Sequence, residues 1–272
     1  MRIARLAGRT VALTSGGAVE VPAEFEGRVL DRWDELLDWS QNATGGRPYA
    51  ESDLEPPVPA PRQIFAVALN YRPHTVEAGY GEPEAPLVFT KFPTCLTGPH
   101  TTVDLPPGHV DWELELVAVI GREARNVPVE KGWEPVVALT VGQDLSERIA
   151  QLAGRPAQFS LAKSHPGFGP IGPALVSLDE VPGRDDLELT CELNGEVVQH
   201  DRTGNMIFPI PRLVSYLSEF CTLLPGDLIF TGTPAGVGNR RTPQRFLTPD
   251  DELVSRIGGV GEMRHRFRRT TP

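Results

Sequence analysis

The sequence is poor in cysteine and has no long apolar segment. Its three cysteines, Cys95, Cys191 and Cys221, are odd in number and lie far apart, which disfavours a disulfide framework or a zinc site. No charge-free apolar run approaches the roughly 18 residues of a membrane-spanning helix, and the N-terminal stretch lacks the apolar core of a signal peptide. We therefore expect a soluble, cytoplasmic protein without a membrane partner.

Basic residues are also scarce. Lysine and arginine together number 26, against 36 aspartate and glutamate residues, which gives a net charge of −10. This balance argues against a nucleic-acid partner bound through a basic face. Only Lys91, Lys131 and Lys163 are lysines, so each of them is worth inspecting.

Glycine and proline are abundant, with 27 of each, and this favours frequent turns and short elements. The proline-rich segment 51–63 is predicted to be an extended linker. It separates a small N-terminal α+β subdomain, residues 1–57, from a main domain, residues 58–272. A unit of under about 60 residues is marginal on its own, so we expect it to pack on the main body.

Composition and pattern predict a mainly β fold with some α structure. The 272 residues are 40% hydrophobic and 23% charged, which is a globular balance. Asn194-Gly195 between alternating runs predicts a hairpin turn. The predicted strands lie at 64–69, 113–120, 137–141 and 228–231, the hairpin at 187–198, and helices at 32–39 and 211–220.

Glu113 and Glu115 stand in the strand-like run ELELVAVI. Because side chains alternate along a strand, both carboxylates share one face, which continues as Val117 and Val119. Carboxylates beside an apolar stretch are costly to bury unpaired, and a divalent cation would pair with both. The alternative is a half-exposed strand whose polar face is acidic.

In VGQDLSERIAQ, the residues Asp144, Arg148 and Gln151 have the spacing of one helical face. This spacing predicts a helix that begins near Asp144. Asp144 would be either the cap of that helix or a third metal ligand. In the second case, Arg148 and Gln151 would face the same cavity and hold a substrate carboxylate or carbonyl.

His74 and Glu77 lie three residues apart in NYRPHTVEAG. One helical turn would bring the imidazole and the carboxylate together as an oriented general base, although an incidental surface pair has the same spacing.

Lys163 precedes a Gly/Pro-rich turn, and it is either a solvated lysine or an ammonium group that binds an anionic ligand. The Gly-rich loop 231–238 lacks the lysine of a phosphate loop but would let the backbone approach a ligand.

Taken together and in this order, these segments resemble the fumarylacetoacetate hydrolase family. Seven motifs in register over roughly residues 58 to 269 are specific. They are LNYRPHTVEAG (69–79), PLVFTKFPTCLTGP (86–99), DWELELVAVIG (111–121), VGQDLSERIAQ (141–151), KSHPGFGPIGP (163–173), LNGEVVQHDRTGNMIF (193–208) and LLPGDLIFTGTPAGVG (223–238).

The resemblance implies a mixed β-roll fold for the main domain, a homodimer, and a site for Mg²⁺ or Mn²⁺. It implies three metal ligands, a catalytic dyad on a lid, a catalytic lysine, and residues that contact the substrate. By position these are Glu113, Glu115 and Asp144 for the metal; His74 and Glu77 for the dyad; Lys163; and Arg148, Gln151, Gly232 and Thr233 for the substrate.

At five positions this chain departs from residues found in members of the family that it resembles. Val67 stands where some members have a fourth acidic ligand, so the chain is similar to the three-ligand branch. Polar residues that the family usually has next to the site are replaced, and such neighbours orient metal ligands. The replacements are Gln143 for asparagine, and Pro73, Ile149 and Pro166 for aspartate; none removes a ligand or the dyad.

The implied activity is metal-dependent hydrolysis of a C–C bond in an acylpyruvate-like 2-oxo acid or 1,3-dicarbonyl substrate, through a stabilised enolate. Decarboxylation of a 2-oxo acid, and isomerisation or tautomerisation of a 2-oxo or 2-hydroxy-dienoic acid, use the same chemistry and remain alternatives. A hypothesis of another class is a protein that binds metal and ligand without turnover. The intact pair of His74 and Glu77 argues against it.

Overall fold

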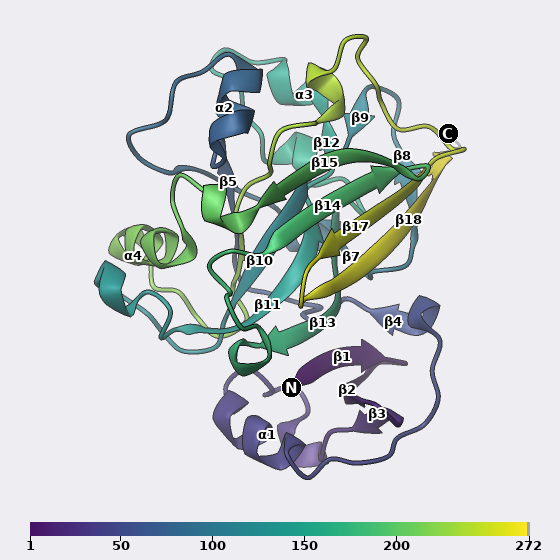
Figure 1. The fold of residues 1–272 in the computed structure, drawn as a ribbon, viewed down its shortest axis with the longest axis vertical. Helices are drawn as coiled ribbons and strands as arrows, with labels where there is room; N and C mark the ends of the chain where they lie inside the picture. The colour runs from purple at the N-terminus through teal and green to yellow at the C-terminus, as the bar shows by residue number, and fades with distance from the viewer. Residues whose placement is uncertain (271–272) are drawn as a thin grey trace.

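The computed structural model describes residues 1–270, and its largest element is an eleven-stranded sheet (Figure 1). Two short strands join it beside the main order, β4 (Leu54–Glu55) on β1 and β7 (Leu96–Thr97) on β13. The main order is β3 (Gly17–Glu20), β2 (Arg9–Thr14), β1 (Arg2–Leu6), β13 (Gly169–Ser177), β11 (Val136–Gln143), β10 (Leu114–Ile120), β16 (Leu228–Phe230), β5 (Ile64–Ala68) and β6 (Leu87–Thr90).

A second sheet lies across β10 and β11 (Figure 1). Its five strands are, in order, β15 (Glu196–Arg202), β14 (Glu188–Leu193), β17 (Glu252–Ile257), β18 (Gly261–Arg269) and β8 (Thr102–Leu105). A separate pair is formed by β9 (Val110–Asp111) and β12 (Ser146–Glu147). The α-helices of the described chain are α1 (Trp33–Ser40), α2 (Arg72–Ala78), α3 (Arg148–Leu152) and α4 (Ile210–Phe220).

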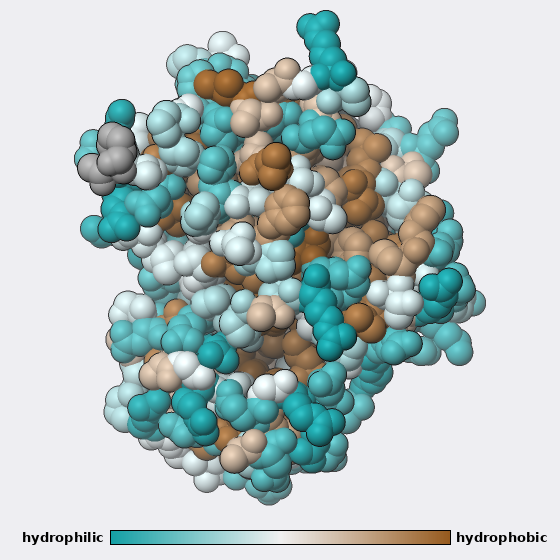
Figure 2. Space-filling model, turned by 180° about the vertical axis from the view of Figure 1, so that it is seen from behind, coloured by the Kyte–Doolittle hydropathy of each residue, from teal (hydrophilic) through white to brown (hydrophobic). Residues whose placement is uncertain are grey.

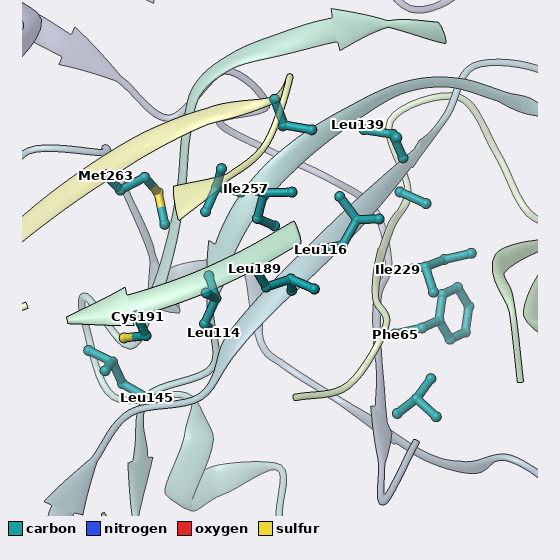
Figure 3. Close-up of a cluster of buried hydrophobic side chains, with 14 of the residues drawn as sticks. Phe65, Leu114, Leu116, Leu139, Leu145, Leu189, Cys191, Ile229, Ile257 and Met263 are labelled. Carbon is teal, nitrogen blue, oxygen red and sulfur yellow. The ribbon is translucent and has the colours of Figure 1, made fainter. Parts of the chain in front are cut away.

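The main core fills the space between the two sheets. Leu114 and Leu116 of β10 meet Leu189 of β14 and Ile257 of β17 there, and all four are fully or almost fully buried (Figure 3). Each such leucine contributes about 1.5–3 kcal/mol of burial. The intervening residues of β10 point to the other face, where Val117 packs in a second cluster with the N-terminal part. Because of this alternation along β10, Glu113 and Glu115 lie on the face that points away from the main core, as predicted.

Most predicted elements are confirmed within a residue or two. The strands at 64–69, 113–120, 137–141 and 228–231 are β5, β10, β11 and β16, and the helices at 32–39 and 211–220 are α1 and α4. The predicted hairpin is β14–β15. Its turn residues Asn194 and Gly195 both have positive φ, 54° and 82°, which is the geometry of a type I′ turn.

The prediction of a helix beginning at Asp144 is wrong. Asp144 follows β11 directly, the chain stays extended through β12, and α3 begins only at Arg148. Glu147 is the residue that caps this helix, because its side chain accepts hydrogen bonds from the backbone N–H groups of Ile149 and Ala150. The buried Leu145 and Ser146 explain the difference, since the segment is part of the core rather than a solvated helical turn.

The proline-rich segment 51–63 is less extended than predicted, since it begins with a short 3-10 helix (Glu51–Asp53) and bends after the short strand β4. It is also fixed to the body rather than free. Leu54 pairs with Leu6 of β1, and Leu54 and Val58 are both buried. The N-terminal part adds to the large sheet through β1, whose Ile3 pairs with Leu175 of β13. No helix within residues 1–270 combines the length and apolar character that crossing a membrane requires.

Candidate metal and substrate site

The register of β10 and β11 brings three carboxylates together. Leu114 pairs with Gln143, so Asp144 comes opposite Glu113, and its backbone N–H donates to the Glu113 carbonyl at 2.9 Å. Glu115 lies two residues along the same face of β10. Ligand oxygens of Glu113, Glu115 and Asp144 all lie within 4.8 Å of one another, and all three residues are buried.

Two lysines contact this carboxylate cluster. Lys163 Nζ donates to Glu113 Oε2 at 2.9 Å and to Asp144 Oδ2 at 2.6 Å. Lys91 Nζ donates to Asp144 Oδ1 at 2.6 Å and also to the Lys163 and Phe168 carbonyls. Both lysines are 2% exposed or less. Sequence analysis gave Lys91 no role, and the scarcity of lysine was the only signal that pointed to it.

Arg148 joins the cluster to a fourth buried carboxylate. Its Nε donates to Asp111 Oδ1 at 2.6 Å, its Nη1 to Gln151 Oε1 at 2.8 Å, and its Nη2 lies 2.7 Å from Glu113 Oε1. Nε and Nη1 are thus committed to protein acceptors, whereas Nη2 pairs with Glu113 by charge and makes no hydrogen bond within the described residues. Gln151 is held by its oxygen, which leaves its amide Nε2 free to donate. Sequence analysis missed Asp111, although alternation would have placed it on the face of Glu113.

The charges of this site favour a cation. Four buried carboxylates, on Asp111, Glu113, Glu115 and Asp144, face three buried cationic side chains, on Lys91, Arg148 and Lys163. Burial acts to raise the pKa of Glu113, but the charges of Lys163 and Arg148 outweigh it and lower that pKa. Burial, with Asp144 and Glu113 nearby, holds the pKa of Glu115 well above its usual range. Oxygen ligands and excess negative charge fit a hard divalent cation such as Mg²⁺ or Mn²⁺.

Glu115 is positioned by the Gly-rich loop after β16. The backbone N–H of Gly232 donates to Glu115 Oε2 at 2.7 Å. Gly232 has φ +93°, and a Cβ there would lie 2.7 Å from Asn70 Cβ, so only glycine fits without strain. Thr233 Oγ1 donates to the Leu114 carbonyl at 2.9 Å. The loop therefore holds the end of β10, and Gly232 supports a carboxylate rather than lining the cavity described below.

Gln143 secures the cluster from the core side. Its Oε1 accepts from the Glu113 backbone N–H at 3.0 Å, and its Nε2 donates to Ser255 Oγ at 2.9 Å. Gln143 itself is fully buried. The glutamine in place of the family's asparagine thus still fixes the backbone of a candidate ligand, and it ties β10 to β17 of the second sheet.

His74 and Glu77 form the predicted pair on α2. His74 Nδ1 lies 3.0 Å from Glu77 Oε2, and Nδ1 must donate because a carboxylate only accepts. Glu77 Oε1 in turn accepts from the backbone N–H of Gly236 at 2.9 Å. The imidazole therefore has a fixed orientation, in which Nε2 of the neutral ring would be the proton acceptor.

One cavity of about 680 Å³ connects these groups. It is lined by one candidate ligand, Glu113, and by five of the predicted catalytic and substrate residues: His74, Arg148, Gln151, Lys163 and Thr233. Its other walls include apolar residues of the α2–β6 segment, such as Tyr80 and Leu87. A candidate general base, a cluster suited to a cation, and hydrogen-bond donors thus share one space, the usual composition of an active site.

Comparisons with known proteins agree with this geometry. The sequence model of the family described as Fumarylacetoacetate (FAA) hydrolase C-terminal matches residues 63–268. The oxaloacetate tautomerase FAHD2A, mitochondrial, of Bos taurus is 38% identical over 216 residues, which are 79% of this chain and 69% of that protein.

Two solved structures extend the likeness over the full length. A candidate HpcE protein from Mycobacterium smegmatis is 51% identical, with a TM-score of 0.93 and 100% of both chains covered. The maleylpyruvate hydrolase from Sphingobium sp. SYK-6 is 27% identical, with a TM-score of 0.84 and 100% of both chains covered. That hydrolase was solved in complex with manganese(II) and pyruvate, a divalent cation and a 2-oxo acid.

Proposed function

This chain belongs to the fumarylacetoacetate hydrolase family and is an enzyme of that family, and from this premise we propose that it catalyses proton transfer on an enolisable 2-oxo acid. The reaction is the keto–enol tautomerisation of a substrate such as oxaloacetate, at a site that uses Mg²⁺ or Mn²⁺. The observation that carries the proposal is the oriented pair of His74 and Glu77, which shares one cavity with Glu113 of the carboxylate cluster.

Glu113, Glu115 and Asp144 would hold the cation. When bound there, it would polarise the two adjacent oxygens of a 2-oxo acid and make the neighbouring carbon and hydroxyl more acidic. The charges of Lys163 and Arg148 would offset negative charge that develops beside Glu113. The amide of Gln151 would donate to a substrate oxygen, because Arg148 already holds the other end of that amide.

His74 would carry the proton. Tautomerisation of the enol removes the proton of the enol hydroxyl and adds a proton to the adjacent carbon. In the neutral imidazole with Nδ1 donating to Glu77, Nε2 is the acceptor, so it would accept the first proton and return one to carbon. Glu77 would stabilise the imidazolium formed between the two steps, and the Gly236 N–H keeps Glu77 in place.

Hydrolysis of an acylpyruvate-like C–C bond, which the sequence analysis placed first, is the second candidate. The similarity to maleylpyruvate hydrolase favours it, since the same histidine could activate a water. It ranks second because tautomerisation needs only the oriented base, whereas hydrolysis also needs a defined place for water. The 38% identity to an oxaloacetate tautomerase also favours proton transfer.

The test follows the loss of enol absorbance of oxaloacetate, with Mn²⁺ and then with a chelator. We expect chelator-sensitive conversion to the keto form, a loss of about 100-fold or more in His74→Gln, and no change in His200→Gln, which alters an exposed histidine. Release of CO₂ would instead indicate decarboxylation, and cleavage of acylpyruvates without tautomerisation would indicate the hydrolase. Absence of any turnover, with oxalate binding retained, would contradict all three.

We also propose a homodimer. Exposed large hydrophobic side chains concentrate on the segments around the cavity, including Val76, Tyr80 and Leu87, and Figure 2 shows such side chains gathered over the larger body in the view from behind. An apolar surface of this kind is typical of a site of protein association.

A further inference from the structure

Three cationic side chains line the cavity, and two of them are already neutralised. Lys163 pairs with Glu113 and Asp144, and Arg148 pairs with Asp111 and Glu113. Arg240 is the third. Within residues 1–270 its side chain makes no hydrogen bond and no ion pair, so its charge is free for a ligand.

The backbone that carries Arg240 is fixed to the site. Residues 231–241 form a loop whose N–H groups donate to three of the site's carboxylates. Gly232 donates to Glu115, Gly236 to Glu77, and Asn239 to Asp111 at 2.6 Å. Arg240 directly follows the last of these anchors. A flexible side chain on a fixed backbone is suited to reach one defined position in the cavity.

The neighbouring Arg241, unlike Arg240, is bound by the protein itself. Arg241 Nη2 donates to the Val198 carbonyl at 3.0 Å, and its guanidinium lies 5.9 Å from the Trp112 ring. Arg241 is therefore committed to the protein, and it does not line the cavity. Of the two adjacent arginines, Arg240 alone is both at the cavity and without a protein partner.

We propose that Arg240 determines specificity by pairing with a second carboxylate of the substrate, so that the enzyme prefers 2-oxo dicarboxylic acids to 2-oxo monocarboxylic acids. The inference rests on the proposed function, because the first carboxylate and the 2-oxo group would occupy the cluster side of the cavity. Arg148 and Lys163 each already pair with two carboxylates of the protein, which leaves Arg240 as the cation whose charge is unpaired within the described chain and can bind a distal carboxylate. The volume of about 680 Å³ leaves room for an acid that extends from the cluster to Arg240.

The experiment compares the binding of two acids to the Mn²⁺-loaded protein by calorimetry. Pyruvate has one carboxylate and 2-oxoglutarate has two. In Arg240→Met, we expect binding of 2-oxoglutarate to weaken about tenfold, the value of a partly exposed charge-assisted contact, while binding of pyruvate changes less than about twofold. Arg240→Lys should recover most of the loss, because it keeps the charge.

Arg212→Met is the matched control. Arg212 is an exposed arginine of α4 that does not line the cavity and has no ion pair within the described chain. Its replacement changes the net charge by the same amount as Arg240→Met does. Three results would overturn this inference but not the proposed function. They are equal effects of Arg240→Met on the two acids, no effect on either acid, or the same effect in Arg212→Met. Failure of both acids to bind the wild-type protein would overturn the proposed function and the inference with it.

Discussion

Single residues in this site act mainly by holding others in place. Asp111 and Gln143 touch no predicted reacting group, yet one holds Arg148 and the other holds the backbone of Glu113. Their contacts join residues more than 25 positions apart in sequence, as do those of Lys91 with Asp144. For this reason the sequence revealed the candidate ligands and the dyad through local motifs, but it could not reveal the partners of Lys91 and Asp111, which are set by the fold.

Gly232→Ala should damage both stability and metal binding. The new Cβ would lie 2.7 Å from Asn70 Cβ and 2.9 Å from the Val67 carbonyl, at a φ of +93°. We expect a loss of about 2 kcal/mol in the free energy of unfolding. We also expect weaker Mn²⁺ binding, because relief of the clash would displace the backbone N–H that donates to Glu115. Gly183→Ala, also at positive φ but with nothing within 4 Å, should cost about 1 kcal/mol and leave Mn²⁺ binding intact. Equal metal affinity in both variants would contradict this role of Gly232.

His265 should make the protein less stable in mild acid. Burial lowers the pKa of His265 to about 4, below the value near 6.5 of an unfolded histidine, so the unfolded chain binds the proton more tightly. Stability is then full above about pH 6.5 and falls as the pH drops toward about 4. From pH 7 to pH 5, the free energy of unfolding, measured with urea, should fall by about 2 kcal/mol more in the wild type than in His265→Leu. Parallel losses in the two proteins would refute this, and His200→Leu serves as the exposed control.

At the level of elements, the loop after β16 orients His74 of α2, the proposed base. Glu77 is the connection, since one oxygen accepts from His74 and the other from Gly236. Glu77→Gln should therefore lower kcat about 100-fold and leave Mn²⁺ affinity and KM nearly unchanged. Glu82→Gln, in the exposed segment after α2, should leave kcat unchanged. A large change in KM with kcat retained would show that Glu77 acts in binding instead.

The pairing of β10 with β11 explains what the sequence could and could not predict about the ligands. Alternation alone places Glu113 and Glu115 on one face of a strand. The spacing of Asp144, Arg148 and Gln151 wrongly predicted one helix, because a period of about 3.6 over so few residues does not distinguish a helix from an extended segment followed by a short helix. The cluster still forms, since the strand register, rather than a helical face, brings Asp144 opposite Glu113.

At the level of the whole molecule, the N-terminal part and the main body share one sheet through β1 and β13. The family match begins at residue 63, and the division into residues 1–57 and 58–272 stays a prediction. The sheet ends at β6, an edge strand on which Leu87 is 47% exposed and Val88 38% exposed. Exposed apolar edges associate readily, and this favours assembly of the larger body.

The proposed homodimer predicts a mass in solution of twice the 29.7 kDa of one chain, measured by light scattering. Because apolar contacts are not screened by salt, the same mass is expected in about 1 M sodium chloride. Leu87→Glu should shift the mass toward that of one chain, while Phe220→Glu, an exposed position on α4, should not. A single-chain mass for the wild type would refute the dimer.

The central claim is that Glu113, Glu115 and Asp144 bind a divalent cation, and an equilibrium titration with Mn²⁺ tests it most directly. We expect about one ion per chain in the wild type and binding weakened more than about 100-fold in Glu115→Gln, which removes a ligand charge without changing its shape. Glu188→Gln, at an exposed glutamate of β14, should bind like the wild type. Absence of Mn²⁺ binding to the wild type, or equal binding by Glu115→Gln, would contradict the account.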